Sequence, residues 1–260
     1  MVTIQTWAER VFFGDTLAEK FLDCDLENTP DIEAKKTLWS DPGRPASLQI
    51  ADRKKRRKLP KPSSLHDKNM RARTLHTFAN HELMAIELCA FALLRYPEAP
   101  ESFRLGVAHI LKDEQRHLQL YLDRLEHFGM QLGDLPVNDH FWRCAPLLDA
   151  PLKWICAVNL TFEQANLDHA PAYAQYFSSV QDEESAALMR VIAEDEIDHV
   201  GFGAAFLNQA TLPEEKSFDL YVGNLTFHNS PSRARGREFS EDLRRRAGLD
   251  ENYIASMKAL

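Results

Sequence analysis

The sequence predicts an all-α protein whose central part is a four-helix bundle. Four long segments between residues 71 and 209 repeat their apolar side chains at helical spacing, and the alternation typical of strands is almost absent. The second and fourth segments each contain Asp-Glu-x-x-His, and the first and third each carry a glutamate on the apolar face. This repetition indicates two similar helical hairpins.

The first 70 residues differ in character from the rest of the chain. Residues 4–22 predict one amphipathic helix, with Trp7 and Val11 among its apolar side chains. Residues 23–70 contain five prolines and the basic run 53–58. We therefore expect an extended arm with few long helices, packed over the body of the protein.

The four long helices have recognisable ends. Pro97 follows the first, Gly129 ends the second and Pro213 follows the fourth. A kink or break is expected near Pro171, because proline removes a backbone hydrogen bond inside a helix. The predicted helices cover residues 71–95, 101–129, 152–177 and 181–209.

The last part of the chain predicts smaller helices, at about residues 233–247 and 250–258. The sequence as a whole therefore divides into three parts. These are an N-terminal helix and arm (1–70), a di-metal four-helix bundle (71–210) and a C-terminal helical tail (211–260).

Composition narrows the class of protein. The chain has 260 residues, of which 44% are hydrophobic and 27% are charged, as is usual for a soluble globular protein. It has no run of eighteen apolar residues that would predict a transmembrane helix, and its start does not resemble a secretory signal. The four cysteines form no CxxC pair, which favours a reducing cytoplasm over a disulfide framework or zinc knuckle. Glycine-rich nucleotide-binding loops are absent.

Charge is unevenly distributed along the chain. Residues 52–73 hold ten Lys or Arg against two Asp, or +8, so the rest of the chain carries −8 minus 8, or −16. The overall acidity disfavours a nucleic-acid surface along the whole chain. The run 53–58 is either a solvated, acid-paired arm or a local contact for RNA or a phosphate-bearing substrate.

Six ionisable side chains repeat between the two halves of the bundle. Glu82 precedes Glu114 by 32 positions, and Glu163 precedes Glu196 by 33. Each of the later glutamates is followed three residues on by a histidine. The candidate metal ligands are Glu82, Glu114, His117, Glu163, Glu196 and His199.

All six ligand candidates lie on helix faces that should be buried. Four carboxylates meeting in one core would repel and lose hydration, at a cost of several kcal/mol each if unpaired. Two divalent cations remove that penalty, and the spacing of Glu-x-x-His places both side chains on one face. Carboxylate oxygens with one imidazole per metal suit iron or manganese better than zinc. The alternative, salt bridges or solvated faces, fits poorly with residues that interrupt the apolar stripes.

The six residues and their order resemble the ferritin-like superfamily of carboxylate-bridged di-iron proteins. More closely, segments 81–87, 113–117, 163–168 and 195–200 are similar to an uncharacterised bacterial ferritin-like family, domain of unknown function 455. The resemblance covers about residues 65–209. It implies a ferritin-like bundle that holds two iron ions or a manganese–iron pair, and a homodimer is one assembly that such bundles adopt.

The resemblance also suggests roles around the ligands. In similar di-iron oxygenases an aspartate supports a ligand histidine of the opposite hairpin, which would pair Asp113 with His199 and Asp195 with His117. Each aspartate is alternatively an exposed acid. Tyr121 stands at the offset of the radical tyrosine in the small subunit of ribonucleotide reductase, so it is either a redox or hydrogen-bonding group or a core tyrosine.

Two further carboxylates are expected to be structural. Glu87 and Asp168 each follow a ligand by five residues, a rotation of about 140° around the helix that takes them off the ligand face.

The implied function is oxidation by the metal centre itself. The protein would be a di-iron or manganese–iron oxidoreductase, such as a monooxygenase, that uses O₂ or peroxide to oxidise or hydroxylate a small organic or nucleoside-like substrate. The substrate and the electron donor are unknown. The alternatives are iron handling or ferroxidase activity, peroxide scavenging, a tRNA-modifying hydroxylase, and a degenerate bundle that only binds. The long arm and the tail argue against a ferritin cage, and the Cys₄ module of rubrerythrin-type peroxidases is missing.

Overall fold

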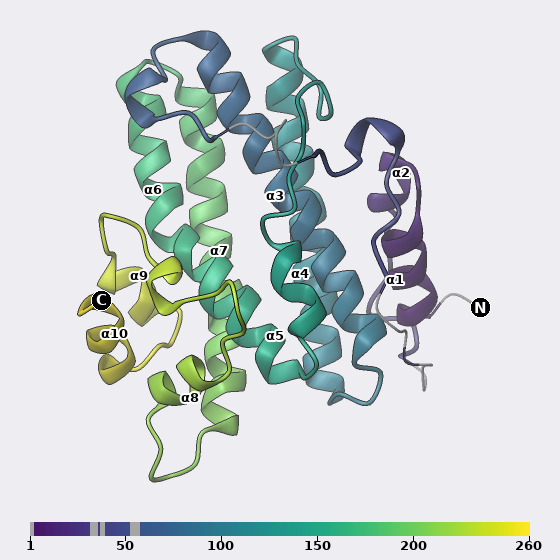
Figure 1. The fold of residues 1–260 in the computed structure, drawn as a ribbon, viewed down its shortest axis with the longest axis vertical. Coiled ribbons are helices and arrows are strands. Elements are labelled where there is room, and N and C mark those ends of the chain that lie inside the picture. Colours follow the sequence, from purple (N-terminus) through teal and green to yellow (C-terminus); the bar gives the residue numbers. More distant parts are fainter. Residues whose placement is uncertain (1–2, 32–35, 37–39, 53–57) are drawn as a thin grey trace. The chain divides into compact units, whose positions relative to one another are not determined.

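Helices are the regular secondary structure of the described part of the chain (Figure 1). The structure is a computed structural model that describes residues 3–31, 36, 40–52 and 58–260. Within those residues it contains ten α-helices and no strand. The all-α class predicted from the sequence is therefore confirmed. The chain divides into two compact units, residues 1–143 and residues 144–260. The three-part division predicted from the sequence stays a prediction.

The first unit is built around one long helical pair. Helix α3 packs along α4, and the N-terminal helix α1 packs against α3. The two long helices begin and end within three residues of the predicted limits. The α-helices of this unit are α1 (Ile4–Phe13), α2 (Leu17–Lys20), α3 (Lys68–Arg95) and α4 (Glu101–His127), with short 3₁₀ turns at Ala46–Leu48 and Pro62–Ser64.

The expected single helix over residues 4–22 is wrong, because the chain forms two helices there. The chain leaves the helical region at Gly14, where ψ is 131°. It starts again at Thr16, whose hydroxyl accepts from the backbone N–H of Glu19 while the Glu19 carboxylate accepts from the backbone N–H of Thr16. This reciprocal capping box stabilises a new helix start, and the apolar periodicity alone did not reveal it.

The second unit also contains a long helical pair, α6 against α7. Two short C-terminal helices, α8 and α9, pack against it and a third, α10, packs on those two. The helix at Ser217–Gly223 was not predicted. The elements are α5 (Pro151–Ala157), a π-helix η5 (Val158–Glu163), α6 (Gln164–Ser179), α7 (Glu183–Ala210), α8 (Ser217–Gly223), a 3₁₀ turn η6 (Pro231–Ala234), α9 (Glu241–Arg246) and α10 (Glu251–Lys258). A further 3₁₀ helix, Trp142–Leu147, crosses the boundary between the units.

The irregularity in the third long segment lies at a different place from the one predicted. Helix α6 continues through Pro171, so the expected break there is wrong. Instead, the six residues of η5 are wound as a π-helix immediately before α6. Gly203 of α7 makes room for it, because a Cβ at this position would lie 2.6 Å from the Cβ of Asn159. The glycine and the π-helix therefore depend on each other.

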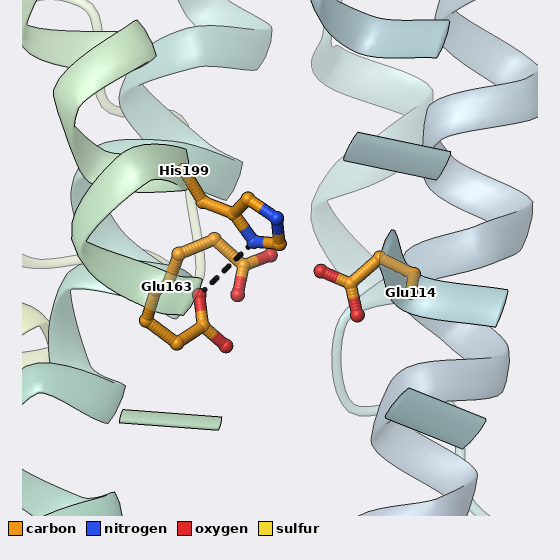
Figure 2. A group of neighbouring side chains, drawn as sticks. Glu114, Glu163 and His199 are labelled. Carbon is orange, nitrogen blue, oxygen red and sulfur yellow. Dashed lines mark ion pairs between the residues drawn. The ribbon is translucent and has the colours of Figure 1, made fainter. Parts of the chain in front are cut away.

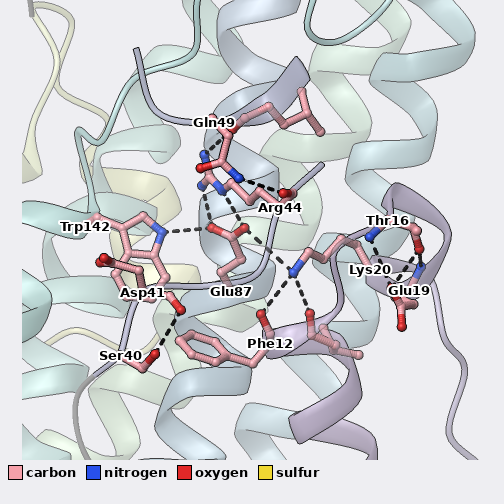
Figure 3. A network of polar contacts seen from close by, with 12 residues as sticks. Phe12, Thr16, Glu19, Lys20, Ser40, Asp41, Arg44, Gln49, Glu87 and Trp142 are labelled. Atoms are coloured by element: carbon pink, nitrogen blue, oxygen red, sulfur yellow. Dashed lines mark hydrogen bonds and ion pairs between the residues drawn. The ribbon is translucent and has the colours of Figure 1, made fainter. Parts of the chain in front are cut away.

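A buried ion pair fixes the N-terminal segment to α3 in the first unit (Figure 3). The Arg44 guanidinium donates to both oxygens of Glu87, at 2.7 and 2.5 Å, and the indole N–H of Trp142 donates to Oε2 at 2.8 Å. Nζ of Lys20 lies 4.0 Å from Oε1 and donates to the carbonyls of Val11 and Phe12, which end α1. Glu87 is thus a structural carboxylate, as its place on the helix predicted.

A matching ion pair fixes the C-terminal tail to α6 in the second unit. The Arg244 guanidinium donates to both oxygens of Asp168, at 2.7 and 2.9 Å. The same carboxylate accepts from the backbone N–H groups of Gly236 and Ser240, at 2.8 and 2.7 Å. Four hydrogen bonds to one buried carboxylate compensate for its lost hydration. Asp168 is therefore structural as well.

One described helix passes a length and hydropathy test for crossing a membrane. It is α3, whose most apolar 18-residue window has a mean hydropathy of 1.2. Because 83% of that window is buried inside the protein, α3 has the burial of a core helix in a soluble protein.

Two sequence features remain to be placed. Residues 53–57 of the basic run lie outside the described residues. All four cysteines are buried thiols, Cys24 and Cys89 in the first unit and Cys144 and Cys156 in the second.

Candidate metal site

The first unit brings three of the predicted ligands together. Glu82 comes from α3, while Glu114 and His117 come from successive turns of α4, where the i, i+3 spacing puts them on one face. One potential ligand atom from each residue lies within 4.8 Å of the other two. Oε2 of Glu114 is 3.5 Å from Nδ1 of His117. These three residues form the first triad.

The second unit repeats this arrangement with the other three. Glu163 is the last residue of the π-helix, and Glu196 and His199 come from α7. Their potential ligand atoms again lie within 4.8 Å of one another. Oε2 of Glu196 lies 3.3 Å from Nδ1 of His199. Figure 2 labels Glu163 and His199 of this second triad, and Glu114 of the first.

Burial and donor chemistry indicate that a divalent cation fits each triad. All six side chains belong to residues that are at most 6% exposed. In the second triad, Oε1 of Glu196 accepts a hydrogen bond from Asn166 at 2.9 Å, whereas Oε2 takes none from any described residue. A buried carboxylate oxygen in that position needs a cation or a proton. Two carboxylates and one imidazole are a ligand set for iron or manganese.

Comparison with known proteins identifies the family. The family model described as "Protein of unknown function (DUF455)" matches residues 4–255, nearly the whole chain. The chain belongs to the DUF455 family. No curated protein and no solved structure matches it.

Side chains of the π-helix η5 form hydrogen bonds with the backbone and side chains beside the second triad of this DUF455 protein. Nδ2 of Asn159 donates to the backbone carbonyl of His199 at 3.0 Å. Thr161 donates its hydroxyl to the carbonyl of Cys156 at 2.7 Å, and its oxygen is 2.9 Å from the Tyr221 hydroxyl. π-helical turns inside α-helices are rare and frequently mark functional sites. Here the π-helix ends at a candidate ligand.

The C-terminal tail reaches the residues around Glu163. The Tyr253 hydroxyl of α10 lies 3.0 Å from the side-chain amide of Gln164, the residue next to Glu163. When the oxygen and nitrogen of the Gln164 amide are exchanged so that both find hydrogen-bond partners, the amide oxygen accepts a hydrogen bond from Nε of Arg244 at 3.0 Å. The tail therefore supports the segment that presents Glu163.

Buried groups with raised pKa values lie beside the π-helix that ends at Glu163. Burial raises the pKa of the Cys156 thiol to about 12. Burial also raises the pKa of Tyr221 and Tyr253 well above the usual tyrosine value. At neutral pH these groups are uncharged, so Cys156 supplies no thiolate.

The two aspartates predicted to support the ligand histidines are partly exposed in this family member. Asp113 is half-exposed, and its Oδ1 lies 3.3 Å from Nη2 of Arg116. Asp195 is of intermediate exposure. The pairing of these two aspartates with the histidines of the opposite hairpins stays a prediction.

Tyr121 is a buried residue of α4. Its ring meets that of Phe78 edge-on, with centroids 6.0 Å apart. This packing suits a core tyrosine, and a redox role stays a prediction.

Sequence reasoning missed Asn166, whose side chain binds the carboxylate of a candidate ligand. Asn166 lies three residues after Glu163, on the same face of α6, and donates to Glu196. A polar residue at i+3 from a predicted ligand is the signal that was available. Neither the π-helix nor the contacts made by the tail had a comparable local signal.

Proposed function

We propose that this protein is a non-haem carboxylate oxidoreductase of the ferritin-like superfamily, whose two triads hold two iron ions or a manganese–iron pair. The observation that carries the proposal is the duplication of one buried set, a Glu with Glu-x-x-His, in both units of the chain. One such triad could serve structure alone. Two triads with the same residue types at nearly equal spacing match the ligand recipe of dinuclear helical bundles.

In this proposal the α3–α4 and α6–α7 hairpins would together supply the ligands of the metal pair, as in a ferritin-like bundle. Each histidine would bind one ion, and the four glutamates would bind or bridge the two ions. The carboxylates balance the positive charge of the cations, and the apolar helix faces around them keep water away. Two ferrous ions bound there would supply electrons to reduce dioxygen while a bound organic substrate is oxidised.

The proposed reaction is O₂-dependent oxidation or hydroxylation of a small organic or nucleoside-like substrate. Its support comes from the segments outside the two hairpins. Arg44 of the arm binds Glu87 and Arg244 of the tail binds Asp168, so segments outside the hairpins make specific buried contacts with them. An iron-storage subunit needs no such additions, whereas a substrate pocket does. The four buried thiols suit a reducing cytoplasm.

The deciding experiment is metal analysis of the full chain, purified without chelator and also reconstituted anaerobically with Fe(II). About two iron or manganese ions per chain, with magnetic coupling between them by Mössbauer or EPR spectroscopy, would support a dinuclear centre. Two uncoupled ions would leave two separate mononuclear sites and overturn the pairing. No metal after reconstitution would overturn the proposal, and a protein that only binds would then be the better explanation.

A second measurement separates oxidation from iron handling. O₂ uptake by the reduced protein is recorded with an excess of Fe(II) and, separately, with pools of small organic and nucleoside substrates. Uptake that depends on an organic substrate supports the oxidoreductase. Uptake that continues with Fe(II) alone and leaves ferric iron in the protein supports a ferroxidase instead.

A further inference from the structure

A small, partly open pocket lies against one face of α3 in the first unit. Part of its wall consists of α3 residues at the spacing of one helix face, and the rest comes from the end of the basic run and from the segment after α4. The polar residues that line it are Lys58, Arg73, His76, Thr77, Asn80 and Asn138. Among the described residues that line this pocket there is no Asp or Glu, although the chain as a whole has a net charge of −8. The pocket therefore has the opposite charge to the whole chain.

The positive charge of the pocket comes from Lys58 and Arg73. Neither side chain forms an ion pair with a described residue. Nη1 of Arg73 contacts Sδ of Met70 at 3.4 Å, and a thioether is only a weak acceptor. Lys58 is exposed, Arg73 is half-buried, and both line the same pocket. Two cations that no carboxylate of the described residues neutralises favour an anion at this place.

His76 adds a neutral donor whose position is fixed. The residue is 3% exposed, and its Nε2 accepts a hydrogen bond from the backbone N–H of Gly133 at 3.1 Å. Burial lowers the pKa of His76 to about 4, although the Asp134 carboxylate opposes this effect. At pH 7 the ring is therefore neutral, and its one proton lies on Nδ1. No described residue accepts a hydrogen bond from Nδ1, so a ligand oxygen is the partner that this buried donor lacks.

Asn80 adds a group of the opposite kind. It is 1% exposed, and its Nδ2 donates to the carbonyl of Asn138 at 3.3 Å. Its Oδ1 takes no hydrogen bond from any described residue. A buried amide oxygen needs a donor, such as a ligand hydroxyl. The pocket thus combines cations and a donor for an anion with an acceptor for a hydroxyl attached to that anion.

A phosphate monoester fits this combination. Its phosphate group has a charge of about −1.5 to −2 at pH 7, which matches two cations, and Arg and Lys are common phosphate partners. We propose that this pocket binds the phosphate group of a small hydroxylated molecule, such as a sugar phosphate. The site is separate from the first triad, because a step of two residues from Asn80 to Glu82 turns about 200° around the helix. It therefore does not depend on bound metal.

The test is isothermal titration calorimetry of the metal-free full chain with inorganic phosphate and with ribose 5-phosphate. The expected result is one saturable site per chain, at which the two probes compete and ribose alone does not bind. Absence of saturable binding of either probe would overturn the inference and leave the proposed metal centre untouched. Binding of single-stranded RNA by a chain that binds neither phosphate probe would also overturn it, in favour of a nucleic-acid contact.

Variants then locate the bound phosphate. Arg73→Met and Lys58→Met should each weaken phosphate binding by about 10–100-fold, because each removes a charged hydrogen-bond partner. Lys61→Met is the matched control, since Lys61 is exposed and lies three residues after Lys58 but outside the pocket. Equal weakening by Lys61→Met would mean a general charge effect and overturn the assignment.

His76→Phe tests the neutral donor, because it keeps a ring but removes Nδ1–H. It should weaken phosphate binding by about 10-fold, as expected for a lost hydrogen bond to a charged group. His76→Gln serves if the phenylalanine variant does not fold, which thermal unfolding checks. Unchanged phosphate binding in a folded His76 variant would show that the phosphate does not occupy this pocket.

Discussion

Each half of the molecule uses a buried arginine–carboxylate ion pair to hold a peripheral segment, the N-terminal arm in one half and the C-terminal tail in the other. In each half, a buried carboxylate lies five residues after a candidate ligand. This carboxylate accepts hydrogen bonds from two nitrogens of one arginine guanidinium. Arg44, from the N-terminal arm, pairs with Glu87, and Arg244, from the C-terminal tail, pairs with Asp168. The ligand and the anchor thus recur as a unit at matched positions. This teaches that the repeat includes the carboxylate that anchors a peripheral segment as well as the candidate metal ligand.

The same two halves differ where the helices of each hairpin touch. In the first half Phe78 of α3 meets Tyr121 of α4, and α3 is a regular helix. At the matching positions the second half has Asn159 and Gly203, and the chain is wound as a π-helix. Two large rings fill this place in the first half, whereas in the second half a Cβ on Gly203 would lie 2.6 Å from the Cβ of Asn159. A local change in side-chain size thus accompanies a change in helix type next to a ligand.

The strongest test of the shared part removes a ligand from either half. Glu114→Gln and Glu196→Gln should each lose most of the bound metal, because a neutral amide replaces a carboxylate ligand. The control is Glu87→Gln, a buried carboxylate on the same helix as Glu82 but outside the triad. It should keep its metal even if its stability falls. Elemental analysis after reconstitution checks all three variants, and equal metal loss in all three would contradict the ligand assignment.

Breaking the two anchors should have the next largest effect. Arg44→Met and Arg244→Met each leave a buried carboxylate without its arginine, which typically costs about 3–5 kcal/mol. Urea unfolding of the metal-free variants measures this loss. Arg245→Met is the control for Arg244→Met, because its ion pairs with Glu241 and Glu251 lie on the surface and should contribute little to stability. A small effect at either buried arginine would show that the anchors are not equivalent.

The difference in helix type is tested at Gly203. Gly203→Ala places a Cβ 2.6 Å from that of Asn159, too close to be accommodated without a shift of η5 or α7. We expect a loss of about 1–3 kcal/mol in the free energy of unfolding, from overpacking. In the first half, Tyr121→Phe keeps the ring and should change stability little. Thermal unfolding of both variants measures the contrast, and an unchanged Gly203→Ala variant would argue against a coupled π-helix.

The smallest predicted effect is a pH dependence of stability that arises at the Glu87 anchor, where Lys20 is buried. Burial lowers the pKa of Lys20, beside Glu87, to about 8, while the unfolded chain has the ordinary value near 10.5. The unfolded state therefore binds more protons between these values, so stability should increase as pH rises from 8 towards 10.5. Between pH 8 and 9.5 the gain should be about 1–2 kcal/mol. Urea unfolding of the natural protein and of Lys20→Met checks this, since the variant should lack the gain.

Much of the helical framework could be predicted from the sequence, because a long helix repeats its apolar residues over many turns. The apolar periodicity of α3, α4 and α7, with their flanking Pro and Gly residues, predicted these helices to within three residues at either end. The same periodicity put each Glu-x-x-His on a buried face, and the structure brings the residues of each triad together. Whether the triads bind metal stays a prediction.

What the sequence did not predict depends on contacts between distant segments. Pro171 suggested a break in the third long helix, but the helix tolerates it, and the irregularity lies earlier, in η5 opposite Gly203. That π-helix depends on a glycine about forty residues further along the chain, so the local sequence pattern could not predict it. Likewise, the contact of Asn166 with Glu196 required the two helices to be placed side by side.

The buried thiols allow the opening of each unit to be followed separately by thiol labelling. Only a thiolate reacts readily with disulfide reagents, and burial raises the pKa of Cys144 to about 11 and that of Cys156 to about 12. Cys24 and Cys89 are buried in the other unit. Labelling of either pair must therefore wait for its own unit to open, so the order in which the thiols react reports which half of the molecule opens first.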